Sequence, residues 1–285
     1  MIQELQNQNM KRRKMSITKQ IINHHLEKGY TPDPKGYLST NEENLLQKFP
    51  NWDKIQKELN DGDGSELEKK FKAVHSSSAF CVNNFALIKQ HKNNVILFGA
   101  SGFDAAEFEK KFPTFLGKPA NLDFYLENEN SRIGIESKFI ETATPSLAKK
   151  DKNLEKYLNH KKLPEKLQKC FNEVIEYYID YKEKLHLDAA QLIKHSIALS
   201  LSVAENKDKK TKLIYLYWVP KNYKDIEIYK EHEKELSIFK GKIKSCQLPF
   251  ESYTYIEFWE MMEKNPILSS ILKKIKARYE FSIKI

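Results

Sequence analysis

Several features that define whole classes of protein are absent from this sequence of 285 residues. It contains no run of about 20 apolar residues, so we expect no membrane-spanning segment. Residues 1–10 lack the apolar stretch of a secretory signal, which favours a cytoplasmic protein.

Cysteine is also rare. Cys81, Cys170 and Cys246 are widely spaced and form no Cys-x-x-Cys pair, which argues against a disulfide framework and against a zinc site. We therefore expect three buried thiols.

Glycine-rich nucleotide-binding motifs are missing as well. The segment 99–102, Gly-Ala-Ser-Gly, is not followed by the Gly-Lys-Ser/Thr of a P-loop, so a nucleoside-triphosphatase is not supported. No helix-turn-helix or zinc-finger pattern is visible either.

The composition is that of a basic globular protein. Hydrophobic residues make up 40% of the chain and the formal net charge is +9, with a pI near 9.1. A basic surface favours a polyanionic partner such as nucleic acid, because neutralising phosphates releases condensed counterions. A host with lysine-rich proteins would produce the same charge, so this alternative stays open.

The most informative stretch contains Asp123 and, thirteen residues later, the triplet Glu136-Ser137-Lys138. Alternate residues of a strand face the same side of a sheet, so Glu136 and Lys138 share one face while the apolar residues beside them share the other. Residues 128–131 are polar turn formers. The sequence therefore predicts an antiparallel hairpin in which Asp123 reaches Glu136.

Two carboxylates and a lysine at one place predict a divalent metal site that hydrolyses phosphodiesters. The alternative is a solvated charge pair, since a Glu-x-Lys spacing also occurs at Glu68 and Lys70. Glu136 and Lys138, however, interrupt an apolar alternation, where an unpaired charge is costly.

These residues resemble the PD-(D/E)xK nuclease superfamily, and in particular type II restriction-endonuclease-like proteins. The resemblance is carried by Asp123, by Glu136-Ser137-Lys138, by the helical run 188–195 and by the apolar strand 213–218. Leu122 stands where the superfamily's signature has proline.

The resemblance implies an α/β (α+β) fold with a restriction-endonuclease-like core, in which helices flank a central mixed β-sheet. Residues 1–70 would form a helical N-terminal extension and residues 71–285 the nuclease domain. Asp123, Glu136 and the Ser137 carbonyl would hold Mg²⁺, for which Mn²⁺ would substitute, and Lys138 would position the attacking water.

Further residues enter through the same resemblance. Glu109, which with Glu107 we expect on a short helix, would join the metal ligands, although a solvated helix face is the alternative. Ser77 would be a helix cap or a phosphate contact. On the predicted helix that contains residues 188–195, Gln191 would approach Lys138 or the scissile phosphate.

Lys194 and His195 would meet the DNA backbone, with a structural histidine as the alternative for His195. The implied partner is double-stranded DNA, and a homodimer is expected because palindromic sites are cut by two symmetric active sites.

We therefore predict that the protein is a Mg²⁺-dependent endodeoxyribonuclease that acts in restriction and defence. Three alternatives remain: a DNA-repair nuclease, a nucleic-acid-binding protein that has kept the fold without turnover, and a partner-binding protein in which Glu136 and Lys138 form an internal ion pair.

Overall fold

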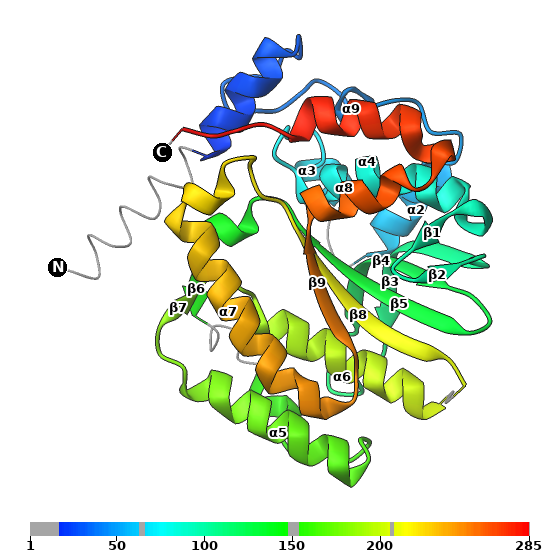
Figure 1. The fold of residues 1–285 in the computed structure, drawn as a ribbon, viewed down its shortest axis with the longest axis vertical. Coiled ribbons are helices and arrows are strands. Elements are labelled where there is room, and N and C mark those ends of the chain that lie inside the picture. The colour runs from blue at the N-terminus through cyan, green and yellow to red at the C-terminus, as the bar shows by residue number, and fades with distance from the viewer. Residues whose placement is uncertain (1–16, 63–65, 148–153, 206–207, 285) are drawn as a thin grey trace, which may run out of the picture.

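The computed structural model describes residues 17–62, 66–147, 154–205 and 208–284. At its centre is a five-stranded mixed sheet in the order β3-β4-β5-β8-β9. Strands β3, β4 and β5 form an antiparallel meander, and β8 and β9 each join in parallel. The strands are β3 (Ala105–Phe112), β4 (Ala120–Glu127), β5 (Ser131–Lys138), β8 (Lys210–Tyr217) and β9 (Phe250–Thr254) (Figure 1).

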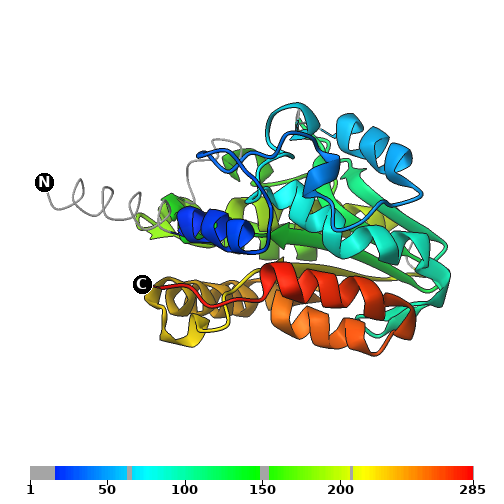
Figure 2. The same cartoon turned by 90° about the horizontal axis from the view of Figure 1, so that it is seen from above.

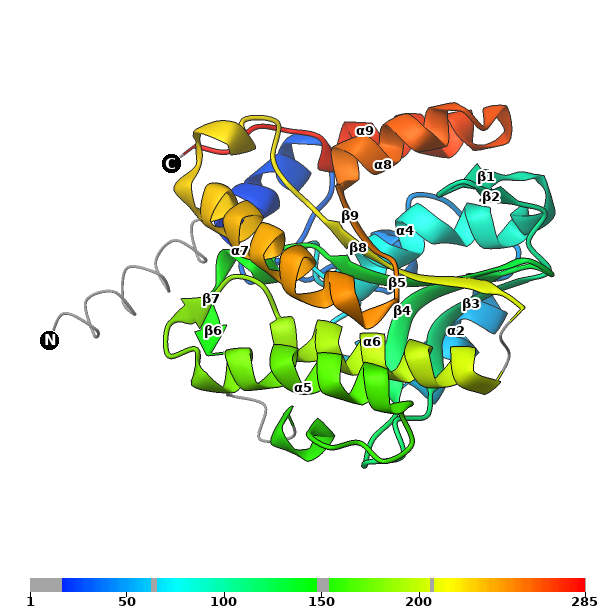
Figure 3. The same ribbon diagram turned by 60° about the horizontal axis from the view of Figure 1, so that its bottom comes forward.

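Helices cover both faces of this sheet (Figure 3). On one side lie α5 (Glu165–Asp180), α6 (Ala189–Glu205) and α7 (Glu227–Ile243). On the other lie α4 (Ser77–Gln90), α8 (Tyr255–Glu263) and α9 (Ser269–Tyr279). Helix α2 (Trp52–Asp61) packs on the edge strand β3, preceding the short α3 (Glu66–Lys69). Two small two-stranded sheets complete the described strands: β1 (Ile96–Leu97) with β2 (Ala100–Ser101), and β6 (Ser146–Leu147) with β7 (Lys184–Leu185).

Local sequence signals account for several of these elements. Helix α4 begins where Ser76 accepts a hydrogen bond from the Ala79 N–H at 3.2 Å, so capping by this serine run is confirmed at Ser76. Buried residues of α5 recur at helical spacing, from Cys170 to Tyr178. The predicted hairpin is confirmed as β4 and β5.

The N-terminal segment packs against the end of the chain (Figure 2). Residues 17–27 are helical, and Ile17 and Ile21 are buried in the same apolar core as the sheet. Arg278 of α9, only 2% exposed, donates to His25 Nε2 at 2.9 Å and to the Asn44 carbonyl at 3.0 Å. A boundary at residue 70 remains a prediction, and residues 1–16 of the predicted extension lie outside the described residues.

Two expectations from the sequence are wrong. Glu107 and Glu109 lie on strand β3 and not on a helix, because residues 105–112 pair along β4 and that pairing outweighs local preference. Cys170 and Cys246 form a disulfide between α5 and the turn after α7, with Cα atoms 5.4 Å apart, whereas Cys81 is a free, buried thiol as expected. Across the described part of the chain, no helix has the length and apolar character needed to cross a membrane.

Candidate active site

The end of strand β5 carries a buried ion pair. Lys138 Nζ lies 2.5 Å from Glu136 Oε1, and the Glu136 side chain is fully buried. Lys138 also donates to Gln191 Oε1 of α6 at 2.7 Å. The lysine is therefore held between a carboxylate of the sheet and an amide of the covering helix.

Asp123 lies beside this pair because the hairpin places it there. The ladder between β4 and β5 ends at the Phe124–Ile135 pair, one residue short of Asp123 and Glu136. Beyond that point Asp123 Oδ2 accepts the Ser137 N–H at 2.6 Å, so a side chain takes over a backbone hydrogen bond. The structure thus brings together the carboxylates and the lysine that the sequence pattern singled out.

Helix α6 adds a second residue one turn after Gln191. His195 Nε2 lies 3.3 Å from Glu136 Oε2, and the imidazole is 2% exposed. Burial, together with the positive charges of Lys138 and Lys194, lowers the pKa of His195 to about 3, so the ring is neutral. A ring so enclosed does not reach the DNA backbone, and that expectation for His195 is wrong. Its neighbour Lys194 is partly exposed, and its contact with DNA remains a prediction.

Electrostatics at the site favour an added cation. Burial raises the pKa of Asp123 well above its usual range, and the Glu136 carboxylate raises it further. Burial likewise raises the pKa of Glu136 to about 7, although Lys138 acts in the opposite direction. Burial alone would lower the pKa of Lys138, but Glu136, Asp123 and Glu141 raise it well above its ordinary value. Lys138 is therefore a stable cation among carboxylates that resist ionising together.

Glu141 also lies near these charged side chains. If strand β5 continued straight, Glu141 would be too far along it to approach the proposed metal ligands. The chain bends after Phe139 into a 3-10 turn, Glu141–Ala143, which returns the side chain toward the sheet. Glu141 Oε2 accepts the Phe139 N–H at 2.7 Å, and Oε1 accepts from the Ser77 hydroxyl. The Ser77 hydroxyl therefore donates to Glu141 in this structure, and its contact with a phosphate remains a prediction.

Glu109 stands opposite Asp123 in the register between β3 and β4. Its φ of 50° is rare for a residue with a side chain and interrupts the regular pairing there. A Cβ placed on Gly62, at the end of α2, would lie 3.1 Å from Glu109 Oε2, so the carboxylate lies toward α2. Glu109 thus lies near Asp123 in the sheet and its charge acts on Glu136, and its role as a metal ligand remains a prediction.

The donors present suit a divalent cation. The buried Glu136 carboxylate contacts Lys138 through Oε1 and His195 through Oε2, and Asp123 lies beside it. Carboxylate and carbonyl oxygens are the ligands that Mg²⁺ prefers. In the described ranges no three His, Cys, Asp or Glu side chains gather closely enough to hold an ion, so the Ser137 carbonyl and the substrate would have to complete the set.

Comparison with known families agrees with the fold. The model of the family described as "Restriction Endonuclease associating with ARP" matches residues 4–280. No curated protein and no solved structure matches the chain. A five-stranded mixed sheet flanked by helices is consistent with the restriction-endonuclease-like fold. Because the match spans almost the entire sequence, the chain belongs to this restriction endonuclease family.

Proposed function

We propose that the protein is a Mg²⁺-dependent endonuclease of the PD-(D/E)xK type that hydrolyses phosphodiester bonds in duplex DNA. The observation that carries the proposal is the position of Lys138, whose ammonium lies between Glu136 and Gln191 at the end of β5 with Asp123 adjacent. Family membership supports a nuclease, and the basic net charge of +9 supports a nucleic-acid substrate.

Asp123, Glu136 and the Ser137 carbonyl would hold the metal ion. When bound, Mg²⁺ supplies Lewis-acid polarisation of the scissile phosphate and lowers the pKa of a coordinated water. Mn²⁺ takes the same oxygen ligands and is expected to substitute for it.

Lys138 positions the attacking water and offsets the negative charge that accumulates on the phosphate. Gln191 fixes the ammonium by accepting one of its hydrogen bonds. The neutral His195 ring contacts the other oxygen of Glu136 and limits its rotation, so it acts as a positioning residue. Gln191 and His195 of α6 therefore hold Lys138 and Glu136 of β5.

The direct test is cleavage of plasmid and phage DNA by the purified full-length protein. Mg²⁺ or Mn²⁺ should give discrete fragments, and EDTA should give none. We expect Lys138→Met and Asp123→Asn to reduce cleavage at least about a hundredfold, the usual loss when a catalytic group is removed. Lys212→Met is the matched control, because this lysine of β8 pairs with Glu251 and takes no part in the site.

Each other outcome has a definite meaning. Full activity in Lys138→Met or Asp123→Asn would remove that residue from the mechanism. Salt-dependent binding without cutting under any metal condition would favour the binding protein without turnover. Sedimentation of the protein with and without a cleaved duplex tests the proposed homodimer.

A further inference from the structure

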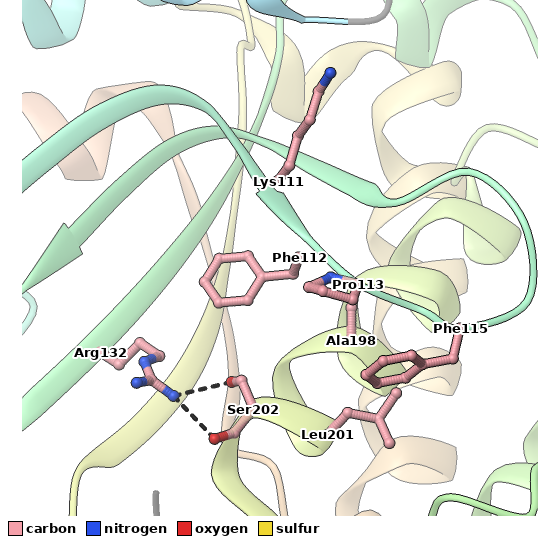
Figure 4. Close-up of a pocket in the computed structure, with 8 residues that line it drawn as sticks. All are labelled: Lys111, Phe112, Pro113, Phe115, Arg132, Ala198, Leu201 and Ser202. Atoms are coloured by element: carbon pink, nitrogen blue, oxygen red, sulfur yellow. Dashed lines mark hydrogen bonds between the residues drawn. The ribbon is translucent and has the colours of Figure 1, made fainter. Parts of the chain in front are cut away.

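The two ends of strand β5 have different surroundings. Near its start, a cavity of about 240 Å³ lies between β5 and α6 (Figure 4). Its arginine, Arg132, donates to the carbonyl and hydroxyl of Ser202 at 3.2 and 3.0 Å and pairs with Glu127 at 3.5 Å. Arg132 is thus held by the fold, and phenylalanine and proline side chains make up much of the remaining wall. The side chains that contact the proposed metal ligands are at the opposite end of the strand.

Ser137, at that opposite end, links two of the proposed metal ligands. Its N–H donates to Asp123 Oδ2 at 2.6 Å, and its own carbonyl is the third proposed ligand. The N–H and the carbonyl of one strand residue point to the same edge of the strand, so both groups of Ser137 face the side of Asp123. At the other edge, the Lys138 carbonyl accepts the Trp218 N–H at 2.9 Å. The position of the Ser137 backbone therefore sets the Asp123 carboxylate and the carbonyl ligand together.

The side chain of Ser137 points to the face of the sheet opposite to that of Glu136 and Lys138, because neighbouring strand residues alternate. There its hydroxyl shares a hydrogen bond of 2.6 Å with the hydroxyl of Tyr255, and either oxygen can be the donor. Both residues are buried. A buried hydroxyl that loses its partner carries a cost in free energy, so each oxygen holds the other in place.

Tyr255 is held firmly by the structure around it. Strand β9 pairs with β8 up to Thr254, and α8 begins at the next residue (Figure 1). Thr254 and Glu257 form a capping box, in which the Thr254 hydroxyl accepts the Glu257 N–H at 3.2 Å and the Glu257 carboxylate accepts the Thr254 N–H at 2.7 Å. The Tyr255 ring packs edge-on against Phe80 of α4, and Phe80 stacks on Phe139, just after β5. The Tyr255 hydroxyl is therefore a fixed point against which Ser137 is held.

We propose that Tyr255 is a positioning residue for the Mg²⁺ site. Its hydroxyl fixes Ser137, which in turn orients the Asp123 carboxylate through its N–H and presents its carbonyl to the ion. Tyr255 lies on the opposite face of the sheet from Lys138, so it acts through Ser137 and changes the affinity for the metal. Partners that orient metal ligands change metal affinity or activity by about 10–100-fold when they are removed. The inference rests on the proposed nuclease activity and its metal site.

The test measures metal binding and cleavage by full-length Tyr255→Phe, which removes only the hydroxyl. Mn²⁺ is the probe for binding, and electron paramagnetic resonance of the free ion gives its dissociation constant without DNA. We expect this constant to rise about tenfold. The Mg²⁺ concentration for half-maximal DNA cleavage should rise by the same factor, with kcat at saturating Mg²⁺ almost unchanged.

Tyr279→Phe is the matched control. The Tyr279 ring is also buried and also packs edge-on against Phe80 and Phe139, but its hydroxyl accepts from Asn83 at 2.9 Å. This variant should lose a buried hydrogen bond of the same kind and keep the wild-type affinity for Mn²⁺. An equal loss of Mn²⁺ affinity in both variants would overturn the specific role of Tyr255.

A second variant tests whether the effect passes through Ser137. Ser137→Ala keeps the N–H and the carbonyl and removes the other hydroxyl of the pair. It should also weaken Mn²⁺ binding about tenfold, and Tyr255→Phe/Ser137→Ala should weaken it no further, because all three variants lack the same hydrogen bond. A loss of about a hundredfold in the double variant would mean that the two residues act independently and would overturn the inference. If Tyr255→Phe does not fold, wild-type Mn²⁺ affinity in Ser137→Ala would overturn it.

The remaining outcomes separate this inference from the proposed function. Wild-type Mn²⁺ affinity in Tyr255→Phe would overturn the role of Tyr255 and leave the nuclease in place. A wild type that binds Mn²⁺ but cuts no DNA would overturn the proposed function, and the binding measurements would still decide the role of Tyr255. A wild type that neither binds Mn²⁺ nor cuts DNA would overturn both.

Discussion

Replacing Glu136 by glutamine should stabilise the metal-free protein relative to the wild type as the pH rises. The pKa of Glu136 is about 7 in the folded protein, whereas its ordinary value of 4.5 applies to the unfolded chain. Between these values the folded protein holds a proton on Glu136 that the unfolded chain has released, so the contribution of Glu136 to stability falls with increasing pH. At about 1.4 kcal/mol for each pH unit, the loss amounts to roughly 3 kcal/mol, and glutamine does not titrate. Removing the Glu136 charge also lowers the pKa of Asp123, which acts in the same direction.

Urea unfolding in EDTA, followed by tryptophan fluorescence at pH 5, 6, 7 and 8, measures this difference. The free energy of unfolding of Glu136→Gln minus that of the wild type should increase by about 3 kcal/mol over the range. Glu263→Gln is the control, because Glu263 is 55% exposed and pairs with Lys276 at the surface. Adding Mg²⁺ at pH 8 should stabilise the wild type more than Glu136→Gln. A difference that does not change with pH would refute the assignment of Glu136 as a buried carboxyl of raised pKa.

Further substitutions test the fold. A methyl group added at Gly134 would lie 2.6 Å from a leucine carbon of β4, so Gly134→Ala should lower the free energy of unfolding in urea by about 1–3 kcal/mol. No atom lies within 4 Å of a methyl group added at Gly241 of α7, so Gly241→Ala should raise the free energy of unfolding by up to about 1 kcal/mol. Burial lowers the pKa of His232 to about 3, so this histidine should contribute a loss of about 2 kcal/mol in the free energy of unfolding from pH 6.5 to pH 5, and His232→Gln should remove that contribution when compared with the wild type at the same pH. The disulfide closes a loop with a sequence separation of 76, and Cys170→Ser/Cys246→Ser should lower stability by about 2–4 kcal/mol without reductant.

Local pattern in the sequence was enough to predict the hairpin that carries the site. The period of two in β4 and β5, with polar turn residues between them, brings Asp123 beside Glu136 just past the last pair of the ladder. The same period puts Glu136 and Lys138 on one face, where they form the ion pair. These relations are short-range, because a two-residue repeat and a tight turn fix register without help from the rest of the chain.

Only the tertiary structure decided which distant residues meet this hairpin. The contact of Gln191 with Lys138 was implied by the family resemblance and is confirmed, whereas the contact of His195 with Glu136 depends on how α6 crosses the sheet. Residues 105–112, which include Glu109, form a strand because β4 offers them a pairing edge, which no local periodicity reveals. The disulfide likewise joins cysteines that only the packing of α5 near the end of α7 brings together. The sequence pattern determines which residues are neighbours within one helix or hairpin. Contacts between separate helices and strands are determined by the packing of the whole core.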